Sequence, residues 1–284
     1  MKIKNIVIMT RSSNSYFNKK AQHIAGELGI NLIIASPDQI DLPLESYLKN
    51  SANVLPRPKE TILWNRIAGS SYDDYDLLIT RNWQQLGAKT VNKIDAHQIY
   101  RDKFLQYLHL KNNNIPVVET YYLPNGQTSL LDHQGPFVAK TLRGAQGKGV
   151  IRLEDKSALE DFLALSKAIS DSRFIIQPFI EYPREHRVLV LKGEIVAHLI
   201  KDKTQEHWKH NGNHAVWREG GKLNDSVYSV VNKITSLEEK FFYAIDFISD
   251  DDKFVVLEVN LCPGVEKAEA TLGKSLIREL LSVI

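Results

Sequence analysis

The sequence is poor in cysteine, in long apolar runs and in excess charge of either sign. Cys262 is the single cysteine among 284 residues, so no disulfide can form within the chain, and we expect a reducing, cytoplasmic location. No stretch approaches the roughly 20 apolar residues that a membrane span requires. The 36 basic and 34 acidic side chains leave a net charge of +2, which gives no electrostatic basis for nucleic acid as a partner.

The first third of the chain alternates strand-like and helix-like segments. Short aliphatic runs predict strands at 6–9, 31–35, 61–64 and 76–80, and a helical pattern that ends at Gly29 predicts a helix over 16–28. We expect 6–9 to be a buried strand rather than part of a signal peptide, because the apolar run is short and no cleavage pattern follows. This order predicts a doubly wound parallel sheet in an N-terminal domain, 1–95. A G-x-G-x-x-G fingerprint is missing after the first strand, which argues against dinucleotide binding there.

Beyond residue 95 the pattern changes, and we expect a second domain over 96–284. A small subdomain is predicted at about 137–177 and a large one at about 178–284. The predicted helices are 95–110, capped by Asp95, then 156–169 and 273–281. The predicted strands are 137–140, 150–153, 173–177, 188–191, 194–200 and 254–260, with 188–200 forming a hairpin around Lys192 and Gly193.

A glycine-rich loop lies between two of these strands. Lys140 ends the first strand, and residues 143–149 include Gly144, Gly147 and Gly149. Glycines allow backbone N–H groups to turn toward an anion, and lysine adds positive charge, so the segment suits a polyphosphate. It is not a Walker A loop, because G-x-x-x-x-G-K-[ST] is absent. A flexible hairpin with solvated lysines is the alternative.

Acidic and amide side chains interrupt two late apolar runs. Glu258 and Asn260 are two residues apart on one predicted strand and therefore face the same side, and Asp246 lies in the preceding run. A buried carboxylate requires a cation or a hydrogen-bond partner, and a set of hard oxygen ligands suits Mg²⁺. A carboxylate paired with an arginine is the alternative. The segment 175–180 joins the two subdomains and either presents backbone groups to a flat base or is a linker.

In their order and spacing these motifs resemble those of the ATP-grasp superfamily. The resemblance is strongest to its RimK-like branch, the ribosomal-protein glutamate ligases. The segments that carry the resemblance are 87–92, 101–103, 114–117, 140–150 and 257–266. The resemblance covers essentially the whole chain. It implies an α/β fold in which an N-terminal parallel-sheet domain precedes a two-subdomain ATP-grasp domain.

The resemblance also implies a set of site residues. Those expected to bind ATP are Lys103, Lys140, Arg143, Gly144, Gln146, Gly147, Gly149, Gln177, Pro178, Phe179, Ile180 and Glu185. Lys103 and Lys140 would contact the phosphates, 177–180 would contact the adenine, and either Glu185 or Glu181 would hold the ribose. Two Mg²⁺ ions, which Mn²⁺ could replace, would be held by Asp246, Glu258 and Asn260. Arg187, Lys201 and Arg218 are the implied catalytic contacts to the acyl group or intermediate.

The implied activity is ATP-dependent ligation of a carboxylate to an amine through an acyl phosphate. An amino acid such as glutamate would be added to a protein, a peptide or a small molecule, and a homo-oligomer is compatible with the branch. The alternatives are a D-alanine–D-alanine-type ligase and an ATP-binding regulatory protein without turnover.

Three further groups of residues are left with two interpretations. The cluster of His207, His210 and His214 is interpreted as part of an acceptor loop, with zinc as the alternative. Cys262 is interpreted as a structural thiol rather than a nucleophile. The residues expected at the ligand-binding edge of the N-terminal sheet, or else solvating its loops, are Arg11, Ser12, Ser13, Arg66 and Arg81.

Overall fold

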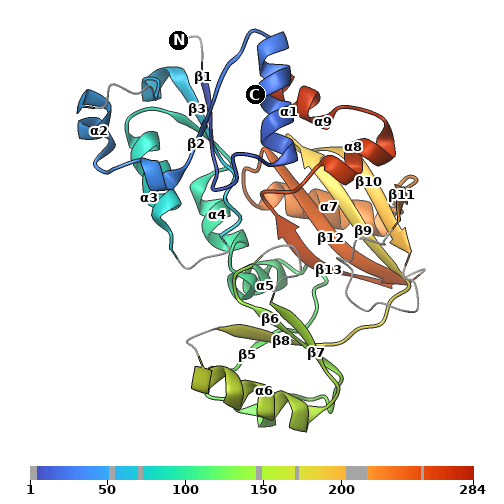
Figure 1. Cartoon of the computed structure of the whole chain (residues 1–284). Helices are drawn as coiled ribbons and strands as arrows, with labels where there is room; N and C mark the ends of the chain where they lie inside the picture. Colours follow the sequence, from blue (N-terminus) through green and yellow to red (C-terminus); the bar gives the residue numbers. More distant parts are fainter. Residues whose placement is uncertain are drawn as a thin grey trace.

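The computed structural model of the chain describes residues 5–50, 55–69, 73–144, 149–169, 173–202, 216–250 and 253–284. Its strands form three sheets, and helices pack around them (Figure 1). Some residues of the predicted sites lie outside the described ranges, namely Gln146, Gly147, His207, His210 and His214.

The N-terminal sheet is parallel throughout, as predicted. Its strand order is β2-β1-β3-β4, and neighbouring strands pair in parallel. Alternate residues of β1 enter different cores: Ile6 and Ile8 pack on the side of α1, and Val7 and Met9 pack on the side of α3. The elements of this part are β1 (Asn5–Met9), α1 (Tyr16–Glu27), β2 (Asn31–Ala35), α2 (Leu44–Asn50), β3 (Thr61–Asn65), α3 (Tyr75–Gln85) and β4 (Lys89–Val91), with 3₁₀ turns at Pro37–Gln39 and Pro58–Glu60.

The strand predicted at 76–80 is wrong, because these residues belong to α3. The buried side chains are Asp76, Leu77, Ile79, Thr80 and Trp83, which together cover one side of the helix. The run Leu77-Leu78-Ile79 is too short to distinguish a strand from a helix by its composition. Arg81 therefore lies exposed on a helix and not at the end of a strand.

The helix predicted over 95–110 is two helices, α4 (Ile94–Tyr100) and α5 (Lys103–Asn112). The break falls at Asp102, whose carboxylate accepts hydrogen bonds from the N–H groups of Phe104 and Leu105 at 3.0 Å each. Asp102, and not Asp95, is thus the acidic N-cap in this region. The cap places Lys103 at the first residue of α5.

The C-terminal helix also begins later than predicted. Gly273 has a left-handed φ of 64° and ends α8 (Glu266–Leu272), as a C-cap glycine does. The last helix, α9 (Leu276–Val283), begins after Ser275 and lies beside α1 (Figure 1).

The large sheet is antiparallel, with strand order β11-β10-β9-β12-β13. Its hairpin between β9 and β10 turns at Lys192 (φ 50°) and Gly193 (φ 88°), as predicted. One face packs on α4, α5 and α7, and the other packs at one end on α1, α8 and α9. The elements are β9 (Arg184–Leu191), β10 (Glu194–Asp202), β11 (Trp217–Glu219), α7 (Asp225–Leu237), β12 (Phe242–Asp250) and β13 (Lys253–Asn260).

The small sheet lies below the large one in Figure 1, with α6 on its far side. Its order is β5-β8-β6-β7, and all its pairs are antiparallel. The elements are β5 (Tyr121–Tyr122), β6 (Phe137–Thr141), β7 (Val150–Leu153), α6 (Lys156–Ile169) and β8 (Phe174–Pro178), with a 3₁₀ turn at Thr128–Leu130. No helix within the described ranges has the length and apolar character needed to cross a bilayer.

Candidate functional site

Strand register brings five predicted site residues to one face of the large sheet. Asp246 on β12 pairs with Arg187 on β9 and with Glu258 on β13, and Glu185 on β9 pairs with Lys201 on β10. Directly paired residues project to the same side, and so do residues two apart on one strand. One face of the sheet therefore carries three carboxylates and two cations close together. They lie on the part of that face that α1, α8 and α9 do not cover.

Arg187 and Asp246 form a two-pronged ion pair. Nε and Nη2 of Arg187 each donate to one carboxylate oxygen of Asp246 at 2.7 Å. Asp246 raises the pKa of Arg187 despite the opposing effect of burial. For Asp246 this is the arginine pairing that the sequence left open as an alternative to metal binding. A metal ion would therefore have to displace Arg187 from the carboxylate oxygens of Asp246 in order to bind them.

Glu258 is the carboxylate of this face that lacks a compensating contact. Burial raises its pKa, and the charges of Lys103, Lys140 and Arg187 only partly oppose that effect. Glu258 makes no hydrogen bond and no ion pair with the part of the chain that the structure describes. A partly buried carboxylate of this kind is costly unless a cation accompanies it.

Asn260, two residues further along β13, uses its side-chain oxygen locally. Its Oδ1 accepts the N–H of Cys262 at 2.8 Å, which fixes the turn after the strand. In the described ranges no group of three or more His, Cys, Asp or Glu side chains is arranged to hold a metal ion. The candidate donor set is therefore Glu258 and Asp246 with the amide oxygen of Asn260, and hard oxygens of this type fit Mg²⁺.

Two lysines approach Glu258 from the other side. Lys140 lies on β6 of the small sheet, and burial lowers its pKa to about 8, with Glu258 and Glu185 opposing and Lys103 reinforcing the shift. Lys103, at the start of α5, donates from Nζ to the carbonyl of Gly144 at 3.0 Å. A cavity is lined by Lys103 and Glu258 but not by Lys140; its lining residues are Ile67, Ala68, His97, Tyr100, Arg101, Lys103, Gly144, Glu258, Asn260, Leu261 and Cys262.

The described ends of the glycine-rich loop are held in place. Gly149 has φ 72°, and a Cβ there would come within 2.5 Å of the Thr141 side chain, so glycine is required. At the other end the guanidinium of Arg143 bonds Asp74 of the N-terminal part at 2.7 Å, while the neighbouring Gly144 lines the cavity.

The connector from β8 to β9 is tied to the small sheet. Nε2 of Gln177 donates to Oγ1 of Thr120 at 2.8 Å, and the N–H of Phe179 donates to the carbonyl of Pro136 at 2.8 Å. The side chain of Gln177 and the N–H of Phe179 are therefore engaged within the protein. Pro178 and Ile180, on either side of Phe179, are partly buried.

Arg218 does not lie on the same sheet face as the other two predicted catalytic residues, Arg187 and Lys201, and its catalytic role stays a prediction. Arg218 pairs with Ile200, whereas its neighbour Trp217 pairs with Lys201. The pleat therefore turns Arg218 to the opposite face, near enough to His198 for its charge to lower the pKa of that imidazole in addition to the effect of burial.

Trp217 is the site residue that sequence reasoning missed. Its ring centre lies 5.8 Å from Nζ of Lys201 and 5.8 Å from Cζ of Arg187. Contacts of this length between cations and an aromatic ring are attractive. The signal in the sequence is the alternation of side chains along a short strand. Because neighbouring residues of a strand face opposite sides, Trp217 rather than Arg218 shares the face of Lys201.

Cys262 and the N-terminal arginines take structural contacts. Burial raises the pKa of Cys262 to about 11, which keeps the thiol protonated and supports a structural role. Arg66 stacks 3.6 Å from the ring centre of Phe17 and donates to the carbonyl of Pro263 at 2.9 Å. Arg11 pairs with Asp73 at 2.6 Å. The remaining two predicted edge residues, Ser12 and Ser13, are exposed.

Comparison with known proteins gives matches over the same region and beyond it. A family model described as RimK-like ATP-grasp domain matches residues 100–284. A probable alpha-L-glutamate ligase of Alkalilimnicola ehrlichii is 23% identical, over 96% of this chain and 92% of that protein. A protein of the same description from Stenotrophomonas maltophilia is 27% identical, over 94% of each chain.

Solved structures match the whole arrangement of sheets. The crystal structure of a RimK domain protein ATP-grasp from Sphaerobacter thermophilus matches with a TM-score of 0.74 and 15% identity, over 98% of each chain. That of the D-alanine–D-alanine ligase from Bacillus anthracis, complexed with ATP, matches with a TM-score of 0.73 and 14% identity, over 100% of this chain and 96% of that one. These matches include the N-terminal parallel sheet.

Proposed function

The chain belongs to the RimK-like ATP-grasp family and is a ligase with the ATP-grasp fold, and from that premise we propose that it joins a carboxylate to an amine through an acyl phosphate. The observation that carries the proposal is the meeting of Lys103 and Lys140 with Glu258. Two cations suited to phosphates lie beside a partly buried carboxylate that a further cation would stabilise. Such a site suits the triphosphate of ATP together with divalent metal.

In the proposed reaction an oxygen of the substrate carboxylate attacks the γ-phosphorus of ATP, and ADP leaves. The amine then attacks the acyl carbon and loses a proton, and phosphate leaves with the former carboxylate oxygen. Because carboxylates are poor electrophiles, phosphorylation supplies the leaving group. The protein contributes mainly position and charge.

Each side chain of the site has a proposed part in this reaction. Lys103 and Lys140 neutralise the phosphates, and Arg187 and Lys201 hold the acyl oxygens. Trp217 keeps these two cations in place through its ring. The oxygens of Asp246, Glu258 and Asn260 would hold two Mg²⁺ ions, which withdraw charge from the phosphates when bound. Arg218 is left out because it faces the other side of the sheet.

The remaining ATP contacts belong to the small sheet and its connector. The backbone of 177–180 would receive the adenine, and Glu185 or Glu181 would receive the ribose. The described loop residues Gly144 and Gly149 would approach the phosphates from the side of β6 and β7.

Glutamate is the proposed amino-acid substrate. The support is the description of the curated relatives as probable alpha-L-glutamate ligases, at 23% and 27% identity. A dipeptide ligase of the D-alanine–D-alanine type is the second candidate, favoured by the match to the Bacillus anthracis structure. The acceptor would be a protein tail, a peptide or a small molecule.

ADP release measured against a panel of amino acids and peptides tests the function. Release that requires both glutamate and a second substrate supports the proposal. Release with D-alanine alone identifies the dipeptide ligase. Tight binding of ATP with no release under any condition would instead identify a regulatory protein and contradict the ligase.

The affinity for ATP is expected to fall as pH rises above 8. In the protein without nucleotide, burial lowers the pKa of Lys140 from 10.5 to about 8. Phosphates bind the protonated amine and raise its pKa, so binding above pH 8 takes up a proton. The Kd for ATP, measured by calorimetry, should be level below pH 7 and should rise by up to about tenfold per unit above pH 8.

The matched control is Lys140→Arg. A guanidinium stays protonated throughout this range, so the variant should show no such rise in Kd between pH 8 and pH 10. The same steep rise in both proteins would show that another group titrates.

A further inference from the structure

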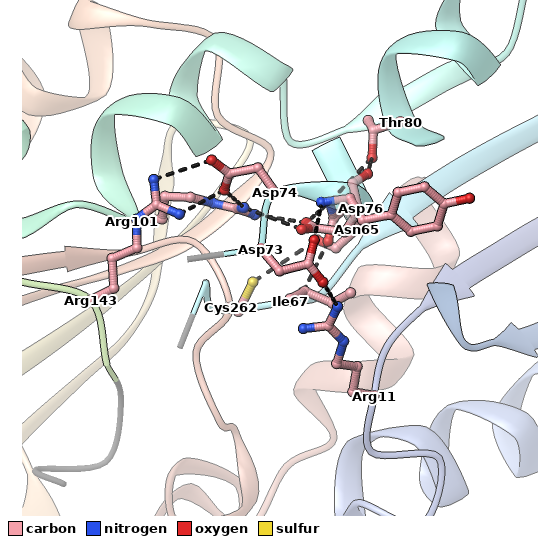
Figure 2. A network of polar contacts seen from close by, with 11 residues as sticks. Arg11, Asn65, Ile67, Asp73, Asp74, Asp76, Thr80, Arg101, Arg143 and Cys262 are labelled. Atoms are coloured by element: carbon pink, nitrogen blue, oxygen red, sulfur yellow. Dashed lines mark hydrogen bonds and ion pairs between the residues drawn. The ribbon is translucent and has the colours of Figure 1, made fainter. Parts of the chain in front are cut away.

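Asp74, the residue before α3, receives hydrogen bonds from two arginines of distant parts of the chain (Figure 2). Its Oδ1 accepts from Nη1 of Arg101 at 2.8 Å and from Nη1 of Arg143 at 2.7 Å. Nη2 of Arg143 also donates to Oδ2 at 3.3 Å. Burial alone would raise the pKa of Asp74, but Arg143 and Arg101 lower it overall, so the carboxylate is ionised at neutral pH.

Arg101 does not depend on Asp74 for its position. Its Nη2 donates to Oδ2 of Asp76 at 2.7 Å, and its Nη1 donates to Oδ1 of Asp76 at 3.2 Å. Asp76 is fully buried and is held in turn by Nδ2 of Asn65 at 2.7 Å. The ion pair of Arg101 with Asp76 remains when Asp74 is changed. Of its two arginine partners, Asp74 is therefore needed to hold Arg143 rather than Arg101.

Arg143 stands at the root of the glycine-rich loop, two residues after β6 ends. The next residue, Gly144, gives its carbonyl to Nζ of Lys103 at 3.0 Å. The loop root is therefore held from two directions, by Lys103 at the start of α5 and by Asp74 at the start of α3. The Arg143 side chain is 14% exposed and that of Asp74 is 43% exposed, so the contact is shielded from water on the side of Arg143.

We propose that Asp74 is a positioning residue that anchors the root of the loop to the start of α3 through Arg143, and thereby sets the affinity for nucleotide. The second part rests on the proposed function, which places the phosphates of ATP at this loop. A loop that is ordered before binding loses less conformational freedom when the ligand arrives, which favours affinity. Arg143 then connects the glycine-rich loop to the start of α3 and does not itself bind the phosphates.

The test compares the full-length chain with Asp74→Asn, Arg143→Met and the double variant. Asp73→Asn is the matched control, because it removes the same charge one residue away, where the carboxylate contacts Arg11. Two quantities are measured: hydrogen exchange of peptides that contain Arg143 and Gly144, without nucleotide, and the Kd for ATP in the presence of Mg²⁺.

Asp74→Asn and Arg143→Met should each speed exchange at the loop root and raise the Kd about tenfold, a size typical of coupling between sites. The double variant should show the same exchange rate and the same Kd as each single variant, because each single substitution already removes the contact between Arg143 and Asp74. Asp73→Asn should change neither quantity.

Three results separate the possibilities. A raised Kd in Arg143→Met with an unchanged Kd in Asp74→Asn would mean that Arg143 touches the ligand directly, and would overturn the proposal. Additive effects in the double variant would overturn it as well. If the wild-type protein binds no ATP while Asp74→Asn still frees the loop root, the anchor is supported and the proposed function fails.

Discussion

Replacing Glu258 with glutamine is expected to lower the rate of ADP release by about 10³-fold. The carboxylate is the one on the site face without a compensating contact among the described residues, and a bound cation is what would stabilise it there. Stabilisation of charge by metal in phosphoryl transfer amounts to several kcal/mol, and each 1.36 kcal/mol changes a rate by about tenfold. The measurement is steady-state ADP release under the conditions that support wild-type turnover.

The same substitution should leave the protein folded, with an unchanged or higher midpoint of urea unfolding. Burial raises the pKa of Glu258, which means that the fold disfavours its charged form, and glutamine has no charge to bury. Glu239→Gln is the matched control, because it makes the same chemical change at an exposed position. Normal turnover in Glu258→Gln would show that the metal assignment is wrong.

Replacing Asp76 with asparagine is expected to destabilise the protein by about 3 kcal/mol. Asp76 is 0% exposed and Arg101 is 6% exposed, so among the described residues the change leaves a buried guanidinium with the more exposed Asp74 as its one ionic partner. A loss of this size is a large part of the 5 to 15 kcal/mol that typically separates folded from unfolded proteins. The measurement is the free energy of unfolding in urea.

A double variant distinguishes the cost of an unpaired charge from a general disturbance of α3. Asp76→Leu with Arg101→Met removes both charges, and it should recover much of the stability that Asp76→Asn loses. A loss below about 1 kcal/mol in Asp76→Asn would contradict the role given to this pair.

The sequence predicts those elements whose pattern is decided locally. Residues 6–9 are an apolar run, β-branched up to Ile8, that is buried on both faces of the sheet. The Lys192-Gly193 turn adopts the positive φ angles that a two-residue hairpin requires. The run 77–79 is apolar in either a helix or a strand, and only packing on β3 and β4 makes it a helix. The break between α4 and α5 follows from the cap at Asp102, a signal present in the sequence but outweighed by the apolar pattern around it.

The site divides in the same way. The shared face of Glu258 and Asn260 follows from the period of one strand. The face of Arg218 depends on the register between β11 and β10, which no local pattern sets, so the inward position falls to Trp217. Asp74, which accepts the hydrogen bond of Arg143, lies 69 residues away in the sequence. Arg187 on β9 donates to the carboxylate of Asp246 on the neighbouring strand β12. Contacts of this kind arise from tertiary packing.

Transfer of ¹⁸O from the substrate tests the central claim most directly. The substrate that supplies the activated carboxylate, whether this is glutamate or its acceptor, is labelled with ¹⁸O in that carboxylate, and the inorganic phosphate formed with ADP is analysed by mass spectrometry. Attack of the carboxylate on the γ-phosphate predicts phosphate that carries one ¹⁸O atom for each amide formed. Unlabelled phosphate in the presence of amide product would contradict the acyl phosphate and the account built on it.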